Sequence, residues 1–400
     1  MAFLGNSAVN RINLHYGVQA LAMGAGGVFF LAFLLHAGVS VPATLAAQAV
    51  IFAGRFVLRP LILPLGRRWG LKPLVIFGVL AIACGYPLLA QVHGIDGWLA
   101  ALCLVLAVGD TFYWSSYHAY FASLGDAEHR GHQIGAREAL AAVVGIVAPL
   151  IGAWALVTLG PRPAFAGVAI VQALSALPLL GAPNVPVLKE APGAFRAARL
   201  GLALCIADGW LGACYYVVWQ IVLFLSLGRS LAAYGGAMAL AALVGAIVGL
   251  ALGRLIDLGH GRRSVVLAYT VAAGVVLLRA ASLGSPWLAV AANALGALVA
   301  ALVLPSMMTA VYNLAKASPC PLRFQIVAEG GWDIGCGLGC LVAAGLAALG
   351  LPLSIAIVLA LPGAAVSTHL LWRYYGGTLA VGETAPDALI AAISQTPTPP

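Results

Sequence analysis

Long apolar runs dominate this chain of 400 residues. Runs of about twenty apolar residues, enough for a helix to span the hydrocarbon core of a bilayer, recur about twelve times. Only 8% of the residues are charged and 62% are hydrophobic, whereas soluble domains carry about 25% charged residues. So few ionic groups cannot cover a water-facing surface, so the runs predict an all-α integral membrane protein. The composition excludes a soluble enzyme, a nucleic-acid-binding module and a disordered protein.

The expected spans fall into two sets of six. The first set covers residues 17–37, 42–64, 73–92, 97–122, 136–159 and 163–181, and the second covers 199–226, 231–253, 264–283, 286–314, 326–349 and 351–374. The segment between the sets is rich in proline and charge, which is typical of a linker. We therefore expect an N-terminal six-helix bundle over 1–181, a connector over 182–198, a C-terminal six-helix bundle over 199–375 and a disordered cytoplasmic tail over 376–400.

Basic residues indicate the orientation. If the N-terminus lies inside, the inner segments hold all but three of the 20 Lys and Arg residues, the exceptions being Arg162, Arg229 and Arg279. The positive-inside rule then places both termini in the cytoplasm. The formal net charge of +8 is explained by these loops and needs no nucleic-acid partner. We expect a multi-pass protein of the cytoplasmic (inner) membrane, in contact with the lipid bilayer and functional as a monomer.

The two sets repeat weakly. At a shift of 192, Tyr120 falls on Tyr312, Gly145 falls on Gly337, and the segment 133–136 (QIGA) falls on 325–328 (QIVA). Parallel repeats of six helices imply a pseudo-twofold axis along the membrane normal, with a binding site between the halves.

One loop carries a family resemblance. Residues 253–263 read GRLIDLGHGRR and resemble the G-x-x-x-D-R-x-G-R-R loop of the major facilitator superfamily (MFS), with one extra residue and without the first Arg. The sister segment 63–72, LPLGRRWGLK, is more eroded, with Arg67 where the family has Asp. The resemblance implies the MFS fold of a secondary transporter and a gating role for the inner loops. The loop residues concerned are Arg67, Arg68, Gly70, Gly253, Asp257, Gly261, Arg262 and Arg263.

Residues 145–152 of the fifth span read GIVAPLIG and loosely resemble the glycine-proline antiporter motif of the same family. The alternative is a packing kink.

The fourth span is the most informative. At helical spacing Asp110, Trp114, Tyr117, His118 and Phe121 share one face. A charged residue in mid-membrane costs about 2.5–3.5 kcal/mol on insertion scales, so this face must look into the bundle or into a water-filled cavity. We interpret it as a substrate-binding wall with a protonatable Asp–His pair. The alternative is a hydrogen-bonded cluster between helices.

The seventh span repeats this pattern in the second half. Asp208, Gly212, Tyr215 and Trp219 share a face, and Tyr216 and Gln220 lie beside it. Asp208 is the matching intramembrane acid, for which we weigh a role in substrate binding or proton coupling against a buried helix cap or a hydrogen bond to a neighbouring helix. In the first span His15, Gln19 and Met23 form a stripe, and His15 is expected at the membrane interface rather than in a site.

Two carboxylates open the eleventh span. Glu329 and Asp333 lie one turn apart, and two such acids repel each other if both ionise. We expect Arg323 or a basic loop residue to neutralise them near the cytoplasmic mouth, in a gating salt bridge. The alternatives are that one of the two acids holds a proton and serves proton coupling, and that they contact the substrate. Their counterparts in the first half are Arg137 and Glu138.

The sequence thus predicts proton-coupled secondary transport of a small organic solute, symport or antiport, by rocking of residues 1–190 against 191–400. Protonation of Asp110 or Asp208 would provide the coupling. The alternatives are a transporter-like receptor or assembly factor without transport and, less favoured, a copper transporter using Cys336, Cys340, Met307 and Met308. Because the spans carry no phosphate loop or nucleophile constellation, we expect no enzyme activity, no cofactor and no resident metal.

Overall fold

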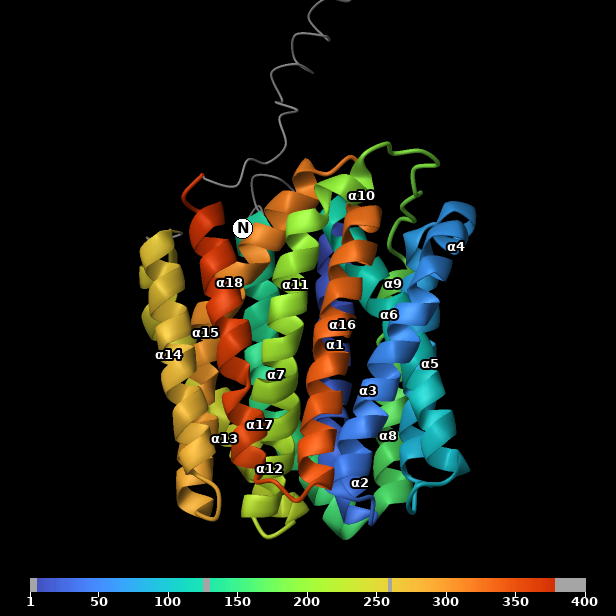
Figure 1. Ribbon diagram of the computed structural model, residues 1–400. Coiled ribbons are helices and arrows are strands. Elements are labelled where there is room, and N and C mark those ends of the chain that lie inside the picture. Colours follow the sequence, from blue (N-terminus) through green and yellow to red (C-terminus); the bar gives the residue numbers. More distant parts are fainter. Residues whose placement is uncertain (1–5, 125–129, 258–260, 378–400) are drawn as a thin grey trace, which may run out of the picture.

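The computed structural model describes residues 6–124, 130–257 and 261–377. In these ranges the chain forms helices that stand side by side in one bundle (Figure 1). In the described ranges, 11 helical stretches are long and apolar enough to cross a membrane, and the shorter apolar helix Val143–Thr158 is a further candidate. The predicted all-α membrane fold with about twelve spans is therefore confirmed.

The first set of helices comprises α1 (Ser7–Ala25), η2 (Gly27–Phe29), α2 (Phe30–His36), α3 (Val41–Leu58), η3 (Arg59–Leu61), α4 (Ile62–Trp69), α5 (Leu71–Leu89), α6 (Gly97–Leu124), α7 (Arg130–Thr158), α8 (Pro161–Leu174) and α9 (Leu177–Leu180). The second comprises α10 (Ala194–Ala197), α11 (Arg199–Gly212), η4 (Ala213–Val217), α12 (Val218–Ser226), α13 (Leu231–Asp257), α14 (Arg262–Ala281), α15 (Pro286–Ala317), α16 (Pro321–Ala348), α17 (Leu353–Val358) and α18 (Ala360–Tyr374). We call them the N-terminal and C-terminal helices.

Polar caps explain where several helices begin. The side chain of Asn6 accepts a hydrogen bond from the Val9 amide at 3.1 Å, so α1 starts ten residues before the expected apolar run. Asp96 caps α6 in the same way, with its Oδ1 accepting from the Leu99 amide at 2.9 Å. Once capped, the apolar segments continue as helices because the backbone can satisfy its polar groups internally.

Glycines allow close packing within the C-terminal helices. Gly331, Gly335 and Gly339 recur every four residues on α16 and face α11. A Cβ at Gly331 would lie 2.7 Å from the Leu202 carbonyl oxygen, and one at Gly335 would lie 2.7 Å from the Trp210 amide nitrogen. The small residues therefore let the two backbones approach to direct contact, as is common between membrane helices.

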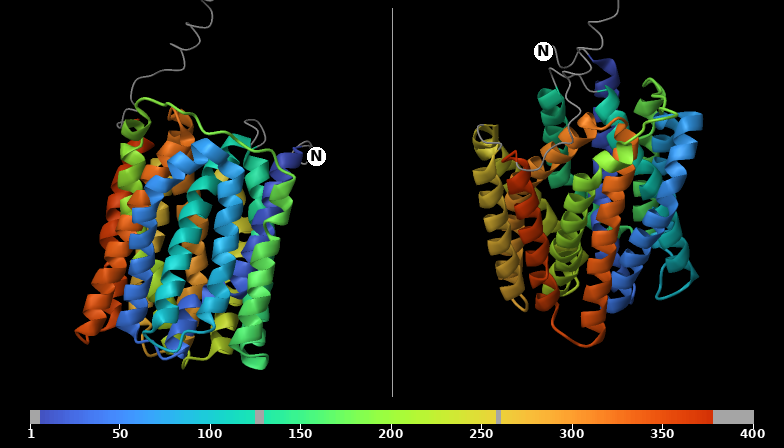
Figure 2. Two further views of the ribbon diagram at one scale, coloured as in Figure 1. Left: turned by 90° about the vertical axis from the view of Figure 1, so that its right-hand side faces the viewer. Right: turned by 45° about the horizontal axis from the view of Figure 1, so that its top comes forward.

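The two sets of helices meet mainly along two seams, α3 against α16 and α7 against α13. Figures 1 and 2 show the start of α1, the end of α18 and the green connecting segment at one end of the bundle. We call it the connector end and the other the opposite end.

The connecting segment lies as an extended strap across the connector end. On one side the Leu71 amide donates to the Val185 carbonyl at 2.9 Å. Arg67 from the N-terminal helices and Arg323 from the C-terminal helices both donate to the Lys189 carbonyl, Arg323 at 2.9 Å. One backbone carbonyl thus joins both sets of helices.

Candidate functional site

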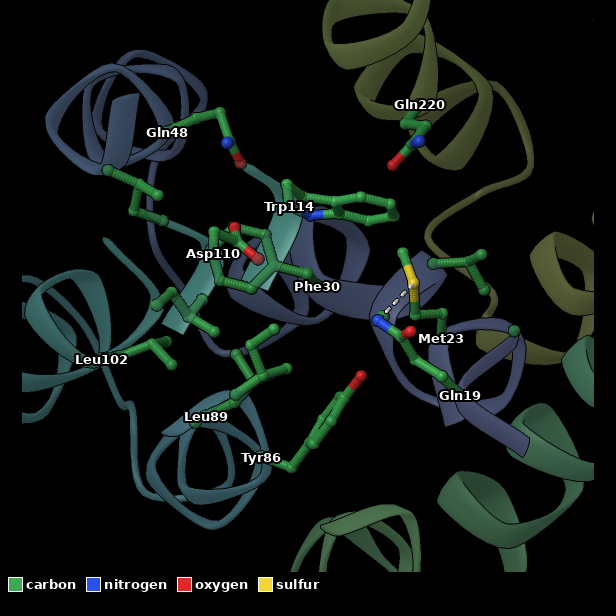
Figure 3. Close-up of a pocket in the computed structure, with 17 residues that line it drawn as sticks. Gln19, Met23, Phe30, Gln48, Tyr86, Leu89, Leu102, Asp110, Trp114 and Gln220 are labelled. Carbon is green, nitrogen blue, oxygen red and sulfur yellow. Dashed lines mark hydrogen bonds between the residues drawn. The ribbon is translucent and has the colours of Figure 1, made fainter. Parts of the chain in front are cut away.

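A cavity of about 330 Å³ lies between the helices, on the side of Asp110 that faces the opposite end. Its wall combines a carboxylate, amides and aromatic rings with apolar side chains (Figure 3). The polar and aromatic members are Asp110, Gln19, Gln48, Gln220, Trp114, Tyr86 and Phe30. Among the lining residues, all of which are described, Asp110 alone carries a charge. The wall comes from α1, η2, α2, α3, α5 and α6, except for Gln220 on α12, which faces Trp114 across the cavity.

Asp110 connects this cavity to a buried ion cluster. The Asp110 side chain is 26% exposed, whereas that of Arg55 on α3 is only 6% exposed, and Nη1 of Arg55 lies 3.8 Å from Oδ2 of Asp110. Arg55 itself does not line the cavity. A molecule in the cavity therefore meets the carboxylate and not the guanidinium behind it.

The cluster spans the seam between α3 and α16. Nε of Arg55 lies 2.9 Å from Oδ1 of Asp333, and Nη2 of Arg55 lies 3.5 Å from Oε2 of Glu329. Arg59 donates through Nε to Oδ2 of Asp333 at 3.0 Å and through Nη1 to Ser115. Two arginines of the N-terminal helices thus hold two acids of the C-terminal helices, on the connector-end side of the cavity.

This differs from the expected partners of the two acids. We expected Arg323 or a loop residue to neutralise Glu329 and Asp333. Arg323 instead binds connector carbonyls. Arg55 and Arg59 are among the Lys and Arg residues expected in the inner segments, and the structure buries them inside the bundle.

A sequence signal for these arginines exists. Arg55 and Arg59 lie four residues apart inside the apolar run 42–64, the same spacing as Glu329 and Asp333 in theirs. Two cations one turn apart in one span and two anions one turn apart in another indicate facing partners.

His118 completes the cluster. Its Nε2 lies 3.7 Å from Oε1 of Glu329, and its Nδ1 lies 3.0 Å from the Tyr312 hydroxyl on α15. The expected Asp110–His118 pair is therefore replaced by a link from His118 to an acid of the other set of helices. Asp110, Glu329 and Asp333 face two guanidiniums, so the described cluster carries one more carboxylate than permanent cations.

The remaining aromatic residues of α6 lie elsewhere. Tyr117 and Phe121 are buried and do not line the cavity, unlike Trp114 on the same helix. The Tyr117 ring stacks on Tyr16, with ring centroids 5.7 Å apart. Helix α1 therefore covers the part of the α6 face that we expected to be open.

A π-helical turn corrects the expected face of the seventh span. Residues 213–217 form η4, a π-helix, so the chain after it is shifted relative to a regular α-helix. Tyr215 and Trp219 consequently point into the protein and are buried, while Tyr216 is 46% exposed and Gln220 lines the cavity. Regular helical spacing predicted that Tyr215 and Trp219 would lie on the face of the site. In the structure Tyr216 and Gln220 take their place.

Asp208 lies apart from the ion cluster. Its Oδ2 accepts a hydrogen bond from the Trp332 indole Nε1 at 3.2 Å, and the residue is half-buried between α11 and α16. Asp208 is not among the residues that line the cavity around Asp110. The structure thus does not bring the two intramembrane aspartates into one pocket.

His15 lies between helices and not on the surface of the bundle. His15 is fully buried, with Nδ1 2.7 Å from the Ser175 carbonyl and Nε2 3.0 Å from the Tyr113 hydroxyl. The Tyr113 hydroxyl also donates to Oε1 of Gln19, which lines the cavity. His15 therefore supports the cavity wall from behind.

The predicted gating loops are described in part. Arg262 donates to the Trp372 carbonyl at 3.1 Å and lies over its ring, and Arg263 is exposed beside Gly261. Arg67 binds the connector, and Arg68 is exposed. Gly70 has φ +81°, a conformation that favours glycine, and the side chain of Asn184 packs against its Cα. The side chains of Arg137, Glu138 and Asp257, the surroundings of Gly253 and the tail 378–400 lie outside what the structure describes.

The glycines of the antiporter-like segment pack against other helices. A Cβ at Gly152 would lie 2.7 Å from the Ala25 carbonyl carbon, and one at Gly145 would lie 3.5 Å from Ala242. Cys336 and Cys340, of the copper hypothesis, are buried against Ala49 and Phe52. Across the described ranges no three His, Cys, Asp or Glu side chains gather in a way that could hold a metal ion.

Comparison with known proteins identifies the family. The sequence profile described as the Major Facilitator Superfamily matches residues 14–225, more than half of the chain. The chain belongs to the major facilitator superfamily. It is thus a multi-pass secondary transporter for a small-molecule substrate in a lipid bilayer, and not an enzyme. A search of curated proteins found no match.

A solved structure agrees with this MFS assignment. The fold is similar to that of the human organic anion transporter MFSD10 (TETRAN), with a TM-score of 0.67 and 17% sequence identity over 91% of this chain and 99% of that one. At this identity the similarity concerns the fold alone.

Proposed function

We propose that this MFS protein exchanges protons for a small, partly apolar organic solute that carries one positive charge. The observation that supports this is the surplus carboxylate. Asp110, Glu329 and Asp333 face Arg55 and Arg59 inside the bundle, where Asp333 and both arginines are buried. An uncompensated buried charge is costly, so a proton or a cationic solute supplies the missing positive charge.

The cavity supports the class of solute. Asp110 offers a carboxylate, Trp114 and Phe30 offer aromatic rings, and Gln19 and Gln220 offer amides. Aromatic faces attract organic cations, and the apolar wall favours a hydrophobic body over a simple sugar. The volume of about 330 Å³ falls in the range of small-molecule sites, about 300–1,000 Å³.

The seam between α3 and α16 supports alternating access. The ion pairs of Arg55 and Arg59 with Asp333 lie between the cavity and the connector end and must separate before the connector end opens. A proton on a cluster carboxylate weakens its attraction to arginine. A proton and a cationic solute therefore compete for the negative charge of the cluster. The binding of either one shifts the equilibrium between the closed and the open seam of α3 and α16.

The location and assembly are part of this proposal. The positive-inside rule supports a cytoplasmic connector end with both termini cytoplasmic, in the cytoplasmic (inner) membrane of the cell. One chain supplies both the cavity and the cluster, which supports function as a monomer.

Reconstitution into vesicles tests the proposal. Ethidium and tetraphenylphosphonium serve as probes, and the expected result is movement driven by an imposed pH gradient that exceeds the leak in protein-free vesicles. Asp110→Asn is expected to abolish this movement. Asp208→Asn tests the second intramembrane acid, and Asp96→Asn, at the half-buried cap of α6, is the matched control.

Two results would contradict the proposal. Undiminished pH-driven transport by both Asp110→Asn and Asp208→Asn would disprove the coupling assignment. Probe binding without counterflow in preloaded vesicles would favour a receptor over a transporter.

A further inference from the structure

Arg279 on α14 is a buried cation without an acidic partner among the described residues. The residue is 3% exposed. Its Nη1 donates to the Tyr215 carbonyl at 2.7 Å. Its guanidinium carbon lies 3.9 Å from the Tyr215 ring centroid and 4.6 Å from that of Trp219. Arg279 was expected at the outer end of the span 264–283, and the structure buries it between helices.

The carbonyl that Arg279 binds belongs to the π-helical turn. Tyr215 is the central residue of η4, Ala213–Val217. A π turn departs from the regular ladder of backbone hydrogen bonds and takes in one extra residue. A donor from another helix can therefore hold such a turn in place, as inserted side chains do at helix kinks.

The two rings held by Arg279 are kept out of the cavity. Trp219 is fixed further because its Nε1 donates to Oδ1 of Asn293 at 3.0 Å, while Nδ2 of Asn293 donates to the Ala237 carbonyl at 2.9 Å. In a regular α-helix, Tyr215 and Trp219 would share the face of Asp208. With the turn in place, Tyr216 and Gln220 take that face instead.

We infer that Arg279 is a positioning residue that determines which side chains the C-terminal helices present to the solute. By binding the Tyr215 carbonyl and stacking on Tyr215 and Trp219, it maintains the π turn and keeps Gln220 in the cavity wall. Without it the turn relaxes to regular helix, Gln220 rotates away and Trp219 rotates in, replacing an amide by a large indole. The importance of Arg279 for transport rests on the function proposed above. Its effect on which side chains line the cavity does not depend on that function.

The geometry requires arginine rather than any cation. The planar guanidinium stacks on two rings while donating in its own plane, and a lysine ammonium cannot do both. The guanidinium also packs on Gly296 of α15, where a Cβ would collide with Nη2. Arg279→Met removes the guanidinium, so we expect the π turn to relax to regular α-helix in that variant. We expect the same change in Arg279→Lys and Gly296→Ala.

Thiol labelling tests the inference without any substrate. In a Cys84→Ser background, single cysteines are introduced as Gln220→Cys and, on the other wall of the same cavity, as Gln48→Cys. Cys84 is the exposed cysteine among the described ones. A water-soluble maleimide reports accessibility, because thiol reactivity depends on access. With Arg279→Met, the labelling rate of Gln220→Cys is expected to fall about tenfold and that of Gln48→Cys to change less than about twofold.

The outcomes are decisive in each direction. Selective loss at position 220 supports the inference, and equal rates at position 220 with and without Arg279 overturn it. A parallel loss at both positions indicates general collapse and also overturns it. Should Arg279→Met fail to fold, Arg279→Lys and Gly296→Ala give the same comparison. The labelling rates do not depend on transport. A failure to observe pH-driven transport would therefore contradict the proposed function without contradicting the role of Arg279.

Discussion

Nε of Arg59, at the start of η3 directly after α3, lies 3.0 Å from Oδ2 of Asp333 on α16, although the two residues are 274 positions apart in the chain. Both side chains are buried, and each belongs to a different set of helices. The contact therefore joins the two sets between the cavity and the connector end.

Removing one member of this pair should destabilise the protein more than removing both. Asp333→Leu leaves Arg55 and Arg59 without their shared partner, and breaking a buried pair costs about 3–5 kcal/mol. Adding Arg59→Leu should recover part of that loss. Thermal unfolding in detergent measures the cycle, and Arg162→Met, at an exposed arginine, is the control. Strictly additive losses would show that the pair contributes nothing.

The regularity of each helix explains which neighbouring residues of the site could be predicted from the sequence. Asp110 and Trp114 lie one turn apart on a regular helix, so helical spacing placed them together correctly. Tyr215 and Trp219 lie beyond a π turn, which regular spacing cannot foresee, and the predicted face was wrong there. The apolar runs themselves were sufficient for the fold, because a bilayer admits few other structures.

Partners across helices were harder to predict. The sequence marks Arg55, Arg59, Glu329 and Asp333 as charges in apolar runs, but only the fold brings α3 against α16. The burial of His15 could not be predicted from the sequence for the same reason. Its burial depends on Tyr113 and Ser175 from two other helices.

Proton release should accompany binding of ethidium. If the surplus carboxylate exchanges a proton for a cation, the unbuffered protein in detergent should acidify the medium as ethidium binds. Glu329→Gln equalises carboxylates and guanidiniums in the cluster and should abolish this release. Glu190→Gln, at an exposed acid of the connector, is the matched control. A pH-indicating dye reports the change, and release persisting in Glu329→Gln would disprove the charge count.

Two glycines should respond oppositely to alanine. Gly335→Ala places a Cβ 2.7 Å from the Trp210 amide nitrogen, and such overpacking typically costs about 1–3 kcal/mol. Gly274 on α14 has open space around it, so Gly274→Ala should stabilise its helix by about 0.5–1 kcal/mol. Melting temperatures of the two variants check this, and equal shifts would argue against the close contact of α11 and α16.

The α6 cap should give an acid-sensitive contribution to stability. Hydrogen bonds from the Leu99 and His93 amides hold the pKa of Asp96 below its usual value. A lowered folded-state pKa means that this stability is present at neutral pH and is lost as the pH falls through that value. The melting temperature of Asp96→Ala should therefore lie below that of the parent at pH 7 and approach it below about pH 4. A constant difference at all pH values would exclude the ionised cap.

The single surplus carboxylate also determines whether the exchange depends on the membrane potential. If the cluster exchanges one proton for one monovalent cation, each cycle moves no net charge across the bilayer. The potential, which acts with about 2.3 kcal/mol per charge per 100 mV, then neither drives nor opposes the exchange. Such a transporter would work at full strength in a depolarised cell and would no longer concentrate the solute when the pH difference is lost.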